Sequence, residues 1–250
     1  DLDVTDKAAW DGLIQTDRGQ SENLLKHFIE EKVVTHPEPI VLLAAADHYR
    51  INAEYTKAVE VLTKILEVDS EHVVALELLC DVLAEEGNLQ LAAFIERLLH
   101  VDADNARGLF HLATIRQYQG RLDEAIETIN KSIAADPSNI RARNLLAILY
   151  SGTFQFDRAA AEFMEILGAD PLDAVSHTNY GLFLLERGRF HEALEEFKIS
   201  IDIAPDSVRG FIGVAETLRR SGLSDEAEEW YRKALKLAPD HPIANLYVNE

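Results

Sequence analysis

The side chains best suited to catalysis or metal binding are scattered along this chain of 250 residues. His191-Glu192 resembles the start of a zinc-binding helix, but Glu195 stands where the second histidine of that motif is required. The nine histidines show no metal-ligand spacing, and the chain has neither a phosphate-binding glycine loop nor a Gly-x-Ser-x-Gly motif. Cys80 is the single cysteine, which excludes an intramolecular disulfide. The sequence therefore predicts a protein that is not an enzyme and that uses no metal or cofactor.

Charge and hydropathy limit the classes of partner. The chain has 44 acidic and 24 basic residues, for a net charge of −20. Because nucleic-acid backbones bind basic surfaces, we expect no nucleic-acid partner. No apolar run approaches the roughly 18 residues of a membrane-spanning helix, so we expect no membrane insertion. The chain begins at Asp1 with neither Met nor a leader, which is typical of a fragment and leaves the cytoplasm as the default expectation.

A strict period of 34 residues organises the segments that carry these side chains. It is marked by four prolines, Pro137, Pro171, Pro205 and Pro239, and by small residues at the same step, Ala125, Ala159, Ala193 and Ala227. Self-similarity at a fixed period near this length indicates an array of helix–turn–helix units that stack on their neighbours.

The segment from Val208 to His241 resembles the tetratricopeptide repeat family at nearly every diagnostic position. Small residues occupy repeat positions 8 and 20, glycine position 15, an aromatic position 24 and proline position 32; the matching residues are Ala215, Ala227, Gly222, Tyr231 and Pro239. The resemblance implies an all-α protein, a right-handed α-solenoid of about six to seven 34-residue helix–turn–helix repeats.

The period also predicts where each unit begins and ends. A degenerate N-terminal repeat or cap is expected at 1–38, and a truncated C-terminal helix is expected to begin in 242–250. Six repeats are expected between them, at 39–72, 73–105, 106–139, 140–173, 174–207 and 208–241. The second of these is one residue short, and its deletion falls between Gly87 and Ile95, so we expect a shortened or rotated second helix there.

Turn and cap residues carry further expectations. Phe154 stands at repeat position 15, where the resembled family has glycine, so we expect a shifted turn in that repeat. Asn139, Asp173 and Ser207 are predicted to cap the first helices of their repeats. Side chains are predicted to cap second helices at four positions, Thr56, Asp123, Asp157 and Asp225.

In the resembled family, the first helix of each repeat lines a concave groove that holds a partner peptide. Transferring the lining positions predicts acidic residues near the N-terminal end, Asp47, Glu77, Asp81 and Glu85. The predicted partner-binding residues are Arg107, Phe110, Thr114, Tyr118, Arg141, Asn144, Ile148, Thr178 and Arg209, and further lining positions are Leu182, Leu185, Ile212, Glu216, Arg219 and Arg220. Arginine suits a carboxylate, the Asn144 amide suits a peptide backbone, and the apolar side chains suit hot-spot anchors.

Three functions remain open at this stage. The preferred one is a protein-interaction scaffold that binds a partner peptide or helix in the groove. The alternatives are a substrate-recruiting arm of a larger enzyme, of the glycosyltransferase or sulfotransferase type, and a scaffold that self-associates through an apolar repeat face. The subgroup that clamps acidic chaperone tails is not matched, because Ile148 and Gly213 stand where that clamp requires polar or basic residues.

Overall fold

The computed structural model describes residue 31, residues 33–34 and residues 38–248 of the chain. Within these ranges all regular secondary structure is helical, which confirms the predicted all-α repeat class. The N-terminal repeat expected at 1–38 falls almost entirely outside the described residues, as do residues 249–250. No helix in the described ranges combines the length and the apolar character needed to cross a bilayer.

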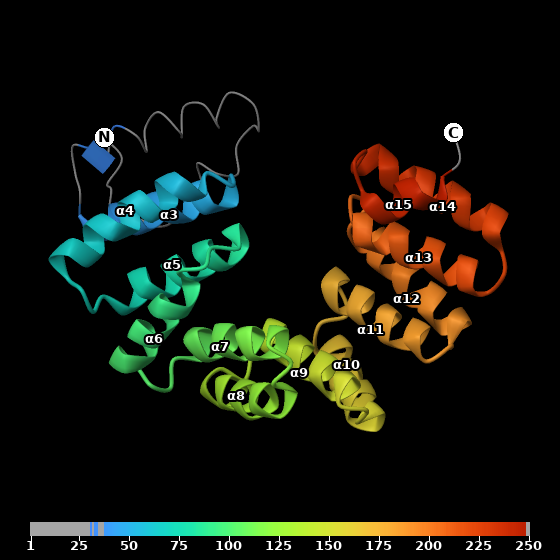
Figure 1. The fold of residues 1–250 in the computed structure, drawn as a ribbon, viewed down its shortest axis with the longest axis horizontal. Coiled ribbons are helices and arrows are strands. Elements are labelled where there is room, and N and C mark those ends of the chain that lie inside the picture. The colour runs from blue at the N-terminus through green and yellow to red at the C-terminus, as the bar shows by residue number, and fades with distance from the viewer. Residues whose placement is uncertain (1–30, 32, 35–37, 249–250) are drawn as a thin grey trace. The chain divides into compact units, whose positions relative to one another are not determined.

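The chain divides into two compact units, residues 1–115 and residues 116–250. Unit 1 contains α3 (Pro39–Ile51), α4 (Tyr55–Val68), α5 (Val73–Glu86), α6 (Leu91–Val101) and most of α7 (Ala106–Tyr118) (Figure 1). Each helix packs against the next from α3 to α6, and α3 also contacts α5. The first helices of the two complete pairs therefore adjoin, as stacked helical repeats require.

Unit 2 repeats the same arrangement over a longer stretch. Its helices are α8 (Leu122–Ala135), α9 (Ile140–Gly152), α10 (Phe156–Ala169), α11 (Ala174–Glu186), α12 (Phe190–Ile203), α13 (Val208–Arg220), α14 (Ser224–Leu237) and the short α15 (Pro242–Tyr247). Helix α11 contacts α9 on one side and α13 on the other, and the second helices pack behind them (Figure 1). This row of first helices positions the candidate site.

Side-chain caps start the first helices, as the sequence predicts. Asn139 accepts a hydrogen bond from the Ala142 backbone N–H at 3.1 Å, and Asp173 accepts one from Ser176 at 3.0 Å. Ser207 caps α13 in the same way. Each cap satisfies one backbone donor that the helix itself leaves unpaired.

The expected caps of the second helices are wrong. Residues two positions before each expected aspartate, Arg121, Gln155 and Leu223, precede those helices and make no side-chain cap. Helix α4 likewise begins at Tyr55, before Thr56. The aspartates instead lie inside the first helical turn, where a negative charge is favoured by the helix dipole.

The turn at Phe154 is also different from the expectation. Phe154 has φ +62°, in the same left-handed region as Gly188 at +71° and Gly222 at +90°. It follows the end of α9 by two residues, as those glycines follow α11 and α13, so the turn is not shifted. This conformation costs a residue other than glycine about 1–2 kcal/mol. The predicted shortening in 73–105 is confirmed, because α6 has 11 residues where α4 has 14.

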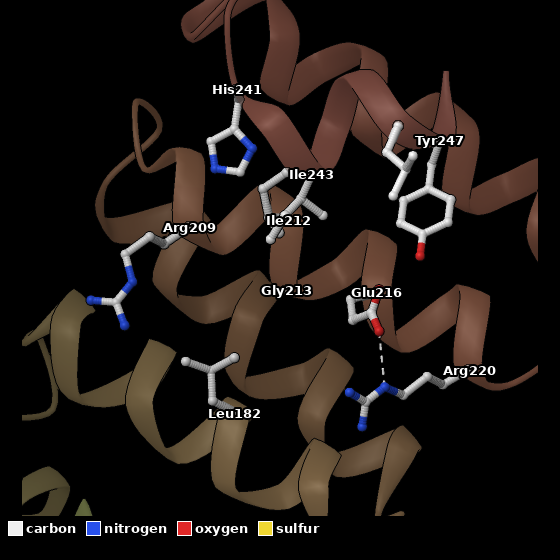
Figure 2. A pocket seen from close by; sticks show the side chains of 10 residues that line it. Leu182, Arg209, Ile212, Gly213, Glu216, Arg220, His241, Ile243 and Tyr247 are labelled. Atoms are coloured by element: carbon white, nitrogen blue, oxygen red, sulfur yellow. Dashed lines mark hydrogen bonds and ion pairs between the residues drawn. The ribbon is translucent and has the colours of Figure 1, made fainter. Parts of the chain in front are cut away.

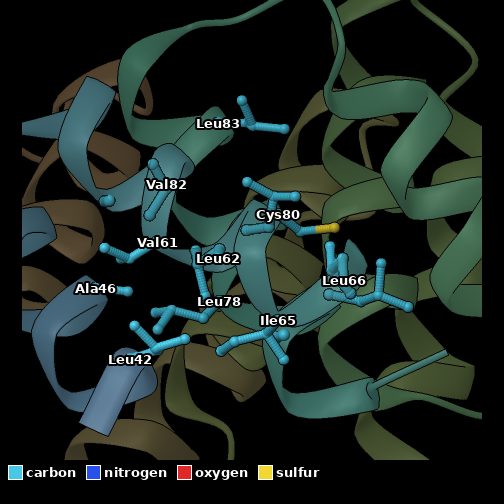
Figure 3. Close-up of a cluster of buried hydrophobic side chains, with 14 of the residues drawn as sticks. Leu42, Ala46, Val61, Leu62, Ile65, Leu66, Leu78, Cys80, Val82 and Leu83 are labelled. Atoms are coloured by element: carbon cyan, nitrogen blue, oxygen red, sulfur yellow. The ribbon is translucent and has the colours of Figure 1, made fainter. Parts of the chain in front are cut away.

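The core of each unit lies between its helices. In unit 1, leucines of α4 and α5 and the fully buried Cys80 form one apolar cluster (Figure 3). Burial raises the pKa of the Cys80 thiol to about 12, so this cysteine is a packing residue without thiolate character. In unit 2, the buried ring of Phe197 packs against Gly181 of α11 and Gly213 of α13. Glycine at both places allows the helices to approach this ring closely.

Candidate functional site

In unit 1 the acidic lining positions have arginine partners. Arg107 Nη1 lies 3.6 Å from Glu77 Oε2 and 3.4 Å from Asp81 Oδ2, both on α5. Asp81 also lies 2.7 Å from the buried His111 ring. Asp47 and Glu85, the other two acidic positions, both pair with Arg50 at 2.7 Å. The Arg107 guanidinium is therefore shared between two carboxylates of its own unit.

The remaining predicted residues of unit 1 face partly inward. Phe110 is half-buried and meets the His111 ring edge-on, with 5.4 Å between ring centroids. The Thr114 hydroxyl donates to the Phe110 carbonyl at 3.0 Å within α7. These contacts fix both side chains against the helix.

In unit 2 the predicted residues divide into an exposed group and a buried group. Tyr118 is 86% exposed, and Arg141 and Ile148 are also exposed. Asn144 and Thr178, by contrast, are only 5% and 3% exposed. Thr178 is within 2.6 Å of the Ser200 hydroxyl and donates to the Ala174 carbonyl, so its polar atom is used inside the unit.

Asn144 belongs to a polar ladder that joins the first helices. Its amide donates to the Ser176 hydroxyl at 2.6 Å and to the Ile140 carbonyl at 3.1 Å. Its carbonyl oxygen accepts from the Asn179 amide at 3.0 Å, and Asn179 in turn accepts from Arg209 Nη2 at 3.4 Å. The ladder runs from α9 through α11 to α13, and it orients the Arg209 guanidinium at its end.

A pocket of about 490 Å³ opens beside Arg209. Figure 2 shows Leu182 of α11, Ile212 of α13 and Ile243 of α15 between Arg209 on one side and Arg220 on the other. Five residues that the repeat register predicts as groove lining meet in it, namely Leu182, Arg209, Ile212, Glu216 and Arg220. Its other lining residues are Gly213, His241, Ile243, Leu246 and Tyr247.

The register could have identified the contribution of α15. Ile243 and Leu246 follow Arg209 and Ile212 by 34 residues, so they occupy the same repeat positions one unit later. The prediction stopped at His241 and therefore missed them. Leu246 is 72% exposed and Ile243 is also exposed, which leaves apolar surface open at the pocket rim.

Glu216 is held as a fixed anion beside this apolar surface. Arg219 approaches it at 2.6 Å, Arg220 Nε at 2.9 Å, and the Tyr231 hydroxyl donates to Oε2 at 2.9 Å. The hydrogen bond from Arg219 is the largest cause that lowers the Glu216 pKa to about 2. Burial and the bond to Glu216 raise the pKa of Tyr231. A carboxylate so fully bonded is a poor general acid or base, because it gives up its ion pairs when it takes a proton.

The contacts of Arg219 and Tyr231 support Tyr247, which lines the pocket. Its guanidinium lies over the Tyr247 ring, 4.9 Å from the centroid, and Tyr247 stacks on Tyr231 at 5.2 Å. No group of three His, Cys, Asp or Glu in the described part of the chain is placed to hold a metal ion. The arrangement offers apolar contact and charge, which are means of binding.

Comparison with known families identifies the repeat. Three models described as tetratricopeptide repeat match residues 91–140, 117–178 and 172–240, and these matches run without a gap from 91 to 240. The chain belongs to the tetratricopeptide repeat family. Repeats of this family stack into arrays with extended binding surfaces, so the predicted repeat protein is confirmed.

Curated relatives match about half of the chain. Protein O-mannosyl-transferase Tmtc1 of Drosophila melanogaster is 29% identical over 139 residues, which are 49% of this chain and 16% of that protein. The type IV pilus assembly protein PilF of Pseudomonas aeruginosa is 27% identical over 130 residues, 51% of this chain and 52% of that protein. The chain thus spans about half or less of the length of these relatives.

Solved tetratricopeptide structures share the fold. The structure of the APC/C hetero-tetramer Cut9–Hcn1 matches with a TM-score of 0.77 at 16% identity, over 90% of this chain and 45% of that chain. A tetratricopeptide repeat protein of Parabacteroides merdae matches with a TM-score of 0.73 at 14% identity, over 96% and 98%. The repeat is typically a non-catalytic interaction module, and the relatives with enzyme names match only in part.

Proposed function

We propose that this tetratricopeptide chain is a non-enzymatic scaffold that binds a segment of a partner protein on the first helices of unit 2. The observation that carries the proposal is the pocket lined by α11, α13 and α15. Its volume of about 490 Å³ lies within the range of roughly 300–1,000 Å³ typical of ligand pockets. An apolar side chain of a partner fits a cavity of this size.

Exposed apolar side chains supply the energy for such binding. Ile243 and Leu246 present isoleucine and leucine side chains to solvent at the rim, next to Ile212 and Leu182. Full burial of one such side chain is worth about 1.5–3 kcal/mol. A partner that covers both side chains gains part of this energy at each, and the surrounding contacts add shape complementarity.

The pocket is built on supported helices, which keeps the cost of ordering it small. Because residues 181 and 213 are glycines, α11 and α13 pack directly against the Phe197 ring. The ladder from Asn144 to Arg209 links the same helices. A preformed site loses less conformational entropy on binding than a mobile one. The predicted residues Tyr118, Arg141 and Ile148 stay candidates for further contacts along the first helices of unit 2.

Peptide display on the whole chain tests this function. The affinity of the selected peptides is then measured for the unaltered chain, for the double variant Ile243→Ser, Leu246→Ser, and for Leu172→Ser as a control. Leu172 is 74% exposed and lies outside the pocket, so the control matches Leu246 in exposure. We expect the double variant to lose at least tenfold in affinity and the control to lose none. Equal binding by the double variant and the control would remove the pocket as the site.

A second candidate function is the recruiting arm of a larger enzyme. The names of two matched relatives favour it: O-mannosyl-transferase Tmtc1, and the probable N-acetylglucosaminyltransferase SPINDLY of Solanum lycopersicum, of which the chain covers 13%. Sequencing the complete transcript tests this reading. A transferase domain in the same open reading frame supports it, and a frame without any catalytic domain rules it out.

A further inference from the structure

We propose that the pocket recognises an acidic segment, in which a bulky apolar side chain stands between Asp or Glu residues on both sides. This inference rests on the proposed function and names the chemistry of its partner. The two ends of the pocket carry the argument, because each presents an arginine whose hydrogen-bonding capacity is largely unused.

Arg209 marks the first end. It is exposed, and its contact within the described part of the chain is one hydrogen bond of 3.4 Å to the neutral amide oxygen of Asn179. No carboxylate of the described residues pairs with it, although acidic residues outnumber basic ones 44 to 24 in the whole chain. An unpaired guanidinium beside an apolar surface is suited to a carboxylate, which it can bind through two parallel hydrogen bonds.

Arg220 marks the second end. It bonds to Glu216 through Nε at 2.9 Å, which leaves its two terminal nitrogens without a recorded partner among the described residues. Glu216 also accepts from Arg219 and Tyr231, so its two oxygens are already shared among three donors. The cluster of two arginines and one glutamate carries one excess positive charge at this end.

The distance between the two ends sets the spacing of the partner. Arg209 and Arg220 are eleven residues apart on α13, which corresponds to about 16 Å along the helix axis. Leu182, Ile212 and Ile243 lie between them (Figure 2). An extended peptide covers that distance with about five residues, so an apolar side chain in the middle places its acidic neighbours at the two arginines.

The same charges select against other segments. Lysine or arginine flanks would face the unpaired Arg209 guanidinium at one end and the excess positive charge at Arg220 at the other, and such like-charge contacts are a means of rejecting wrong partners. Uncharged flanks would leave Arg209 and the terminal nitrogens of Arg220 without a carboxylate while the peptide partly desolvates them. The net charge of −20 opposes the approach of an acidic segment to the chain as a whole, so its binding depends on locally positive groups such as these two arginines.

Defined peptides test the inference by fluorescence anisotropy with the whole chain. The probe is an amidated, labelled peptide, Gly-Asp-Glu-Ser-Ile-Leu-Ser-Glu-Asp-Gly. Comparison peptides carry serine or lysine in place of the acids, or glycine in place of Ile-Leu. A further peptide has serine flanks and ends in Ile-Leu with a free carboxylate, which separates a chain terminus from acidic side chains. A labelled oligothymidylate tests a phosphate backbone.

We expect the acidic probe to bind at least tenfold more tightly than the serine peptide, and the lysine peptide to bind weakest. In the double variant Arg209→Gln, Arg220→Gln, the affinity for the acidic probe should fall to that for the serine peptide. Arg232→Gln is the matched control, because Arg232 is an exposed arginine of α14 outside the pocket. Circular dichroism confirms that each variant is folded.

Several results would overturn the inference. One is that the acidic probe does not bind. Others are that the serine or free-terminus peptide binds as tightly as the acidic probe, or that the lysine peptide or the oligothymidylate binds more tightly. The last is that the double arginine variant keeps its full affinity for the acidic probe. A different result would refute the proposed function: display-selected peptides, whatever their charge, would bind the double variant Ile243→Ser, Leu246→Ser as tightly as the unaltered chain.

Discussion

The close approach of α13 to Phe197 predicts a destabilising effect for the substitution Gly213→Ala. An added Cβ would lie 2.4, 2.5 and 2.7 Å from three atoms of the Phe197 ring, well inside van der Waals contact. The ring is fully buried, and Gly181 faces it from α11, where an added Cβ would lie 2.8 Å away. The ring is therefore confined by two helices and cannot relieve the overlap without loosening other contacts.

The two opposing terms can be compared. Overpacking a well-packed core costs about 1–3 kcal/mol, and an overlap as deep as 2.4 Å belongs at the upper end. Alanine is favoured over glycine in a helix by about 1 kcal/mol. We expect a net loss of about 2 kcal/mol, because the overlap outweighs the gain in helix propensity.

Urea unfolding of the whole chain, followed by far-ultraviolet circular dichroism, measures this difference. Gly168→Ala in α10 is the matched control, because its added Cβ meets nothing within 4 Å. The control should raise the unfolding midpoint, since only the gain of about 1 kcal/mol acts there. Phe197→Leu should lessen the penalty of Gly213→Ala. A Gly213→Ala midpoint as high as that of Gly168→Ala would refute the packing argument.

Three further predictions concern titration, polar packing and reactivity. The folded Glu216 pKa of about 2 lies below its ordinary 4.5, so its stabilisation is present above pH 4.5 and is lost as the pH falls toward 2. Solvent screening reduces that contribution to about 1 kcal/mol, and acid titration of Glu216→Gln should show a correspondingly smaller fall in thermal stability. Asn144→Ala should lower the unfolding free energy by about 1–3 kcal/mol, because Ser176 and Asn179 lose partners; exposed Asn130→Ala is its control, and equal effects would contradict the ladder. Cys80 should react with a thiol reagent at pH 8 only after unfolding, as its raised pKa and burial require, and fast labelling of the native chain would contradict this.

The backbone of this protein could be predicted because the repeat acts on each unit through local chemistry. Proline ends a helix, Asn139, Asp173 and Ser207 start the next one, and glycine supplies the left-handed turn. The prediction failed where context overrides the residue. Phe154 adopts the left-handed conformation that glycine takes in neighbouring turns, in a loop whose flanking helices α9 and α10 pack on each other, and phenylalanine by itself gives no signal for that conformation.

The candidate site was less predictable, because the repeat position of a residue predicts which face of the helix it lies on but not how deeply its side chain is buried. Asn144, Thr178 and Ile212 occupy the same repeat position, yet the first two are buried and the third lines the pocket. A short polar side chain reaches a hydroxyl of a neighbouring helix, as Thr178 reaches Ser200, and tucks into the helix interface. Isoleucine has no such partner and remains at the surface of the groove. Side-chain length and the neighbouring helix therefore decide what a partner can touch.

Two of the three arginines at repeat position 2 show how the preceding first helix decides their role. The first helix one repeat before Arg107 is α5, which presents Glu77 and Asp81. The Arg107 guanidinium forms ion pairs with both. The first helix one repeat before Arg209 is α11, which presents Asn179 and Leu182 instead. The Arg209 guanidinium therefore has no carboxylate there and lies beside the pocket. The recurrence of arginine is thus a poor guide to binding by itself. Reading each arginine against the groove-facing residues one repeat earlier separates an internal ion pair from a group that can receive a partner's carboxylate.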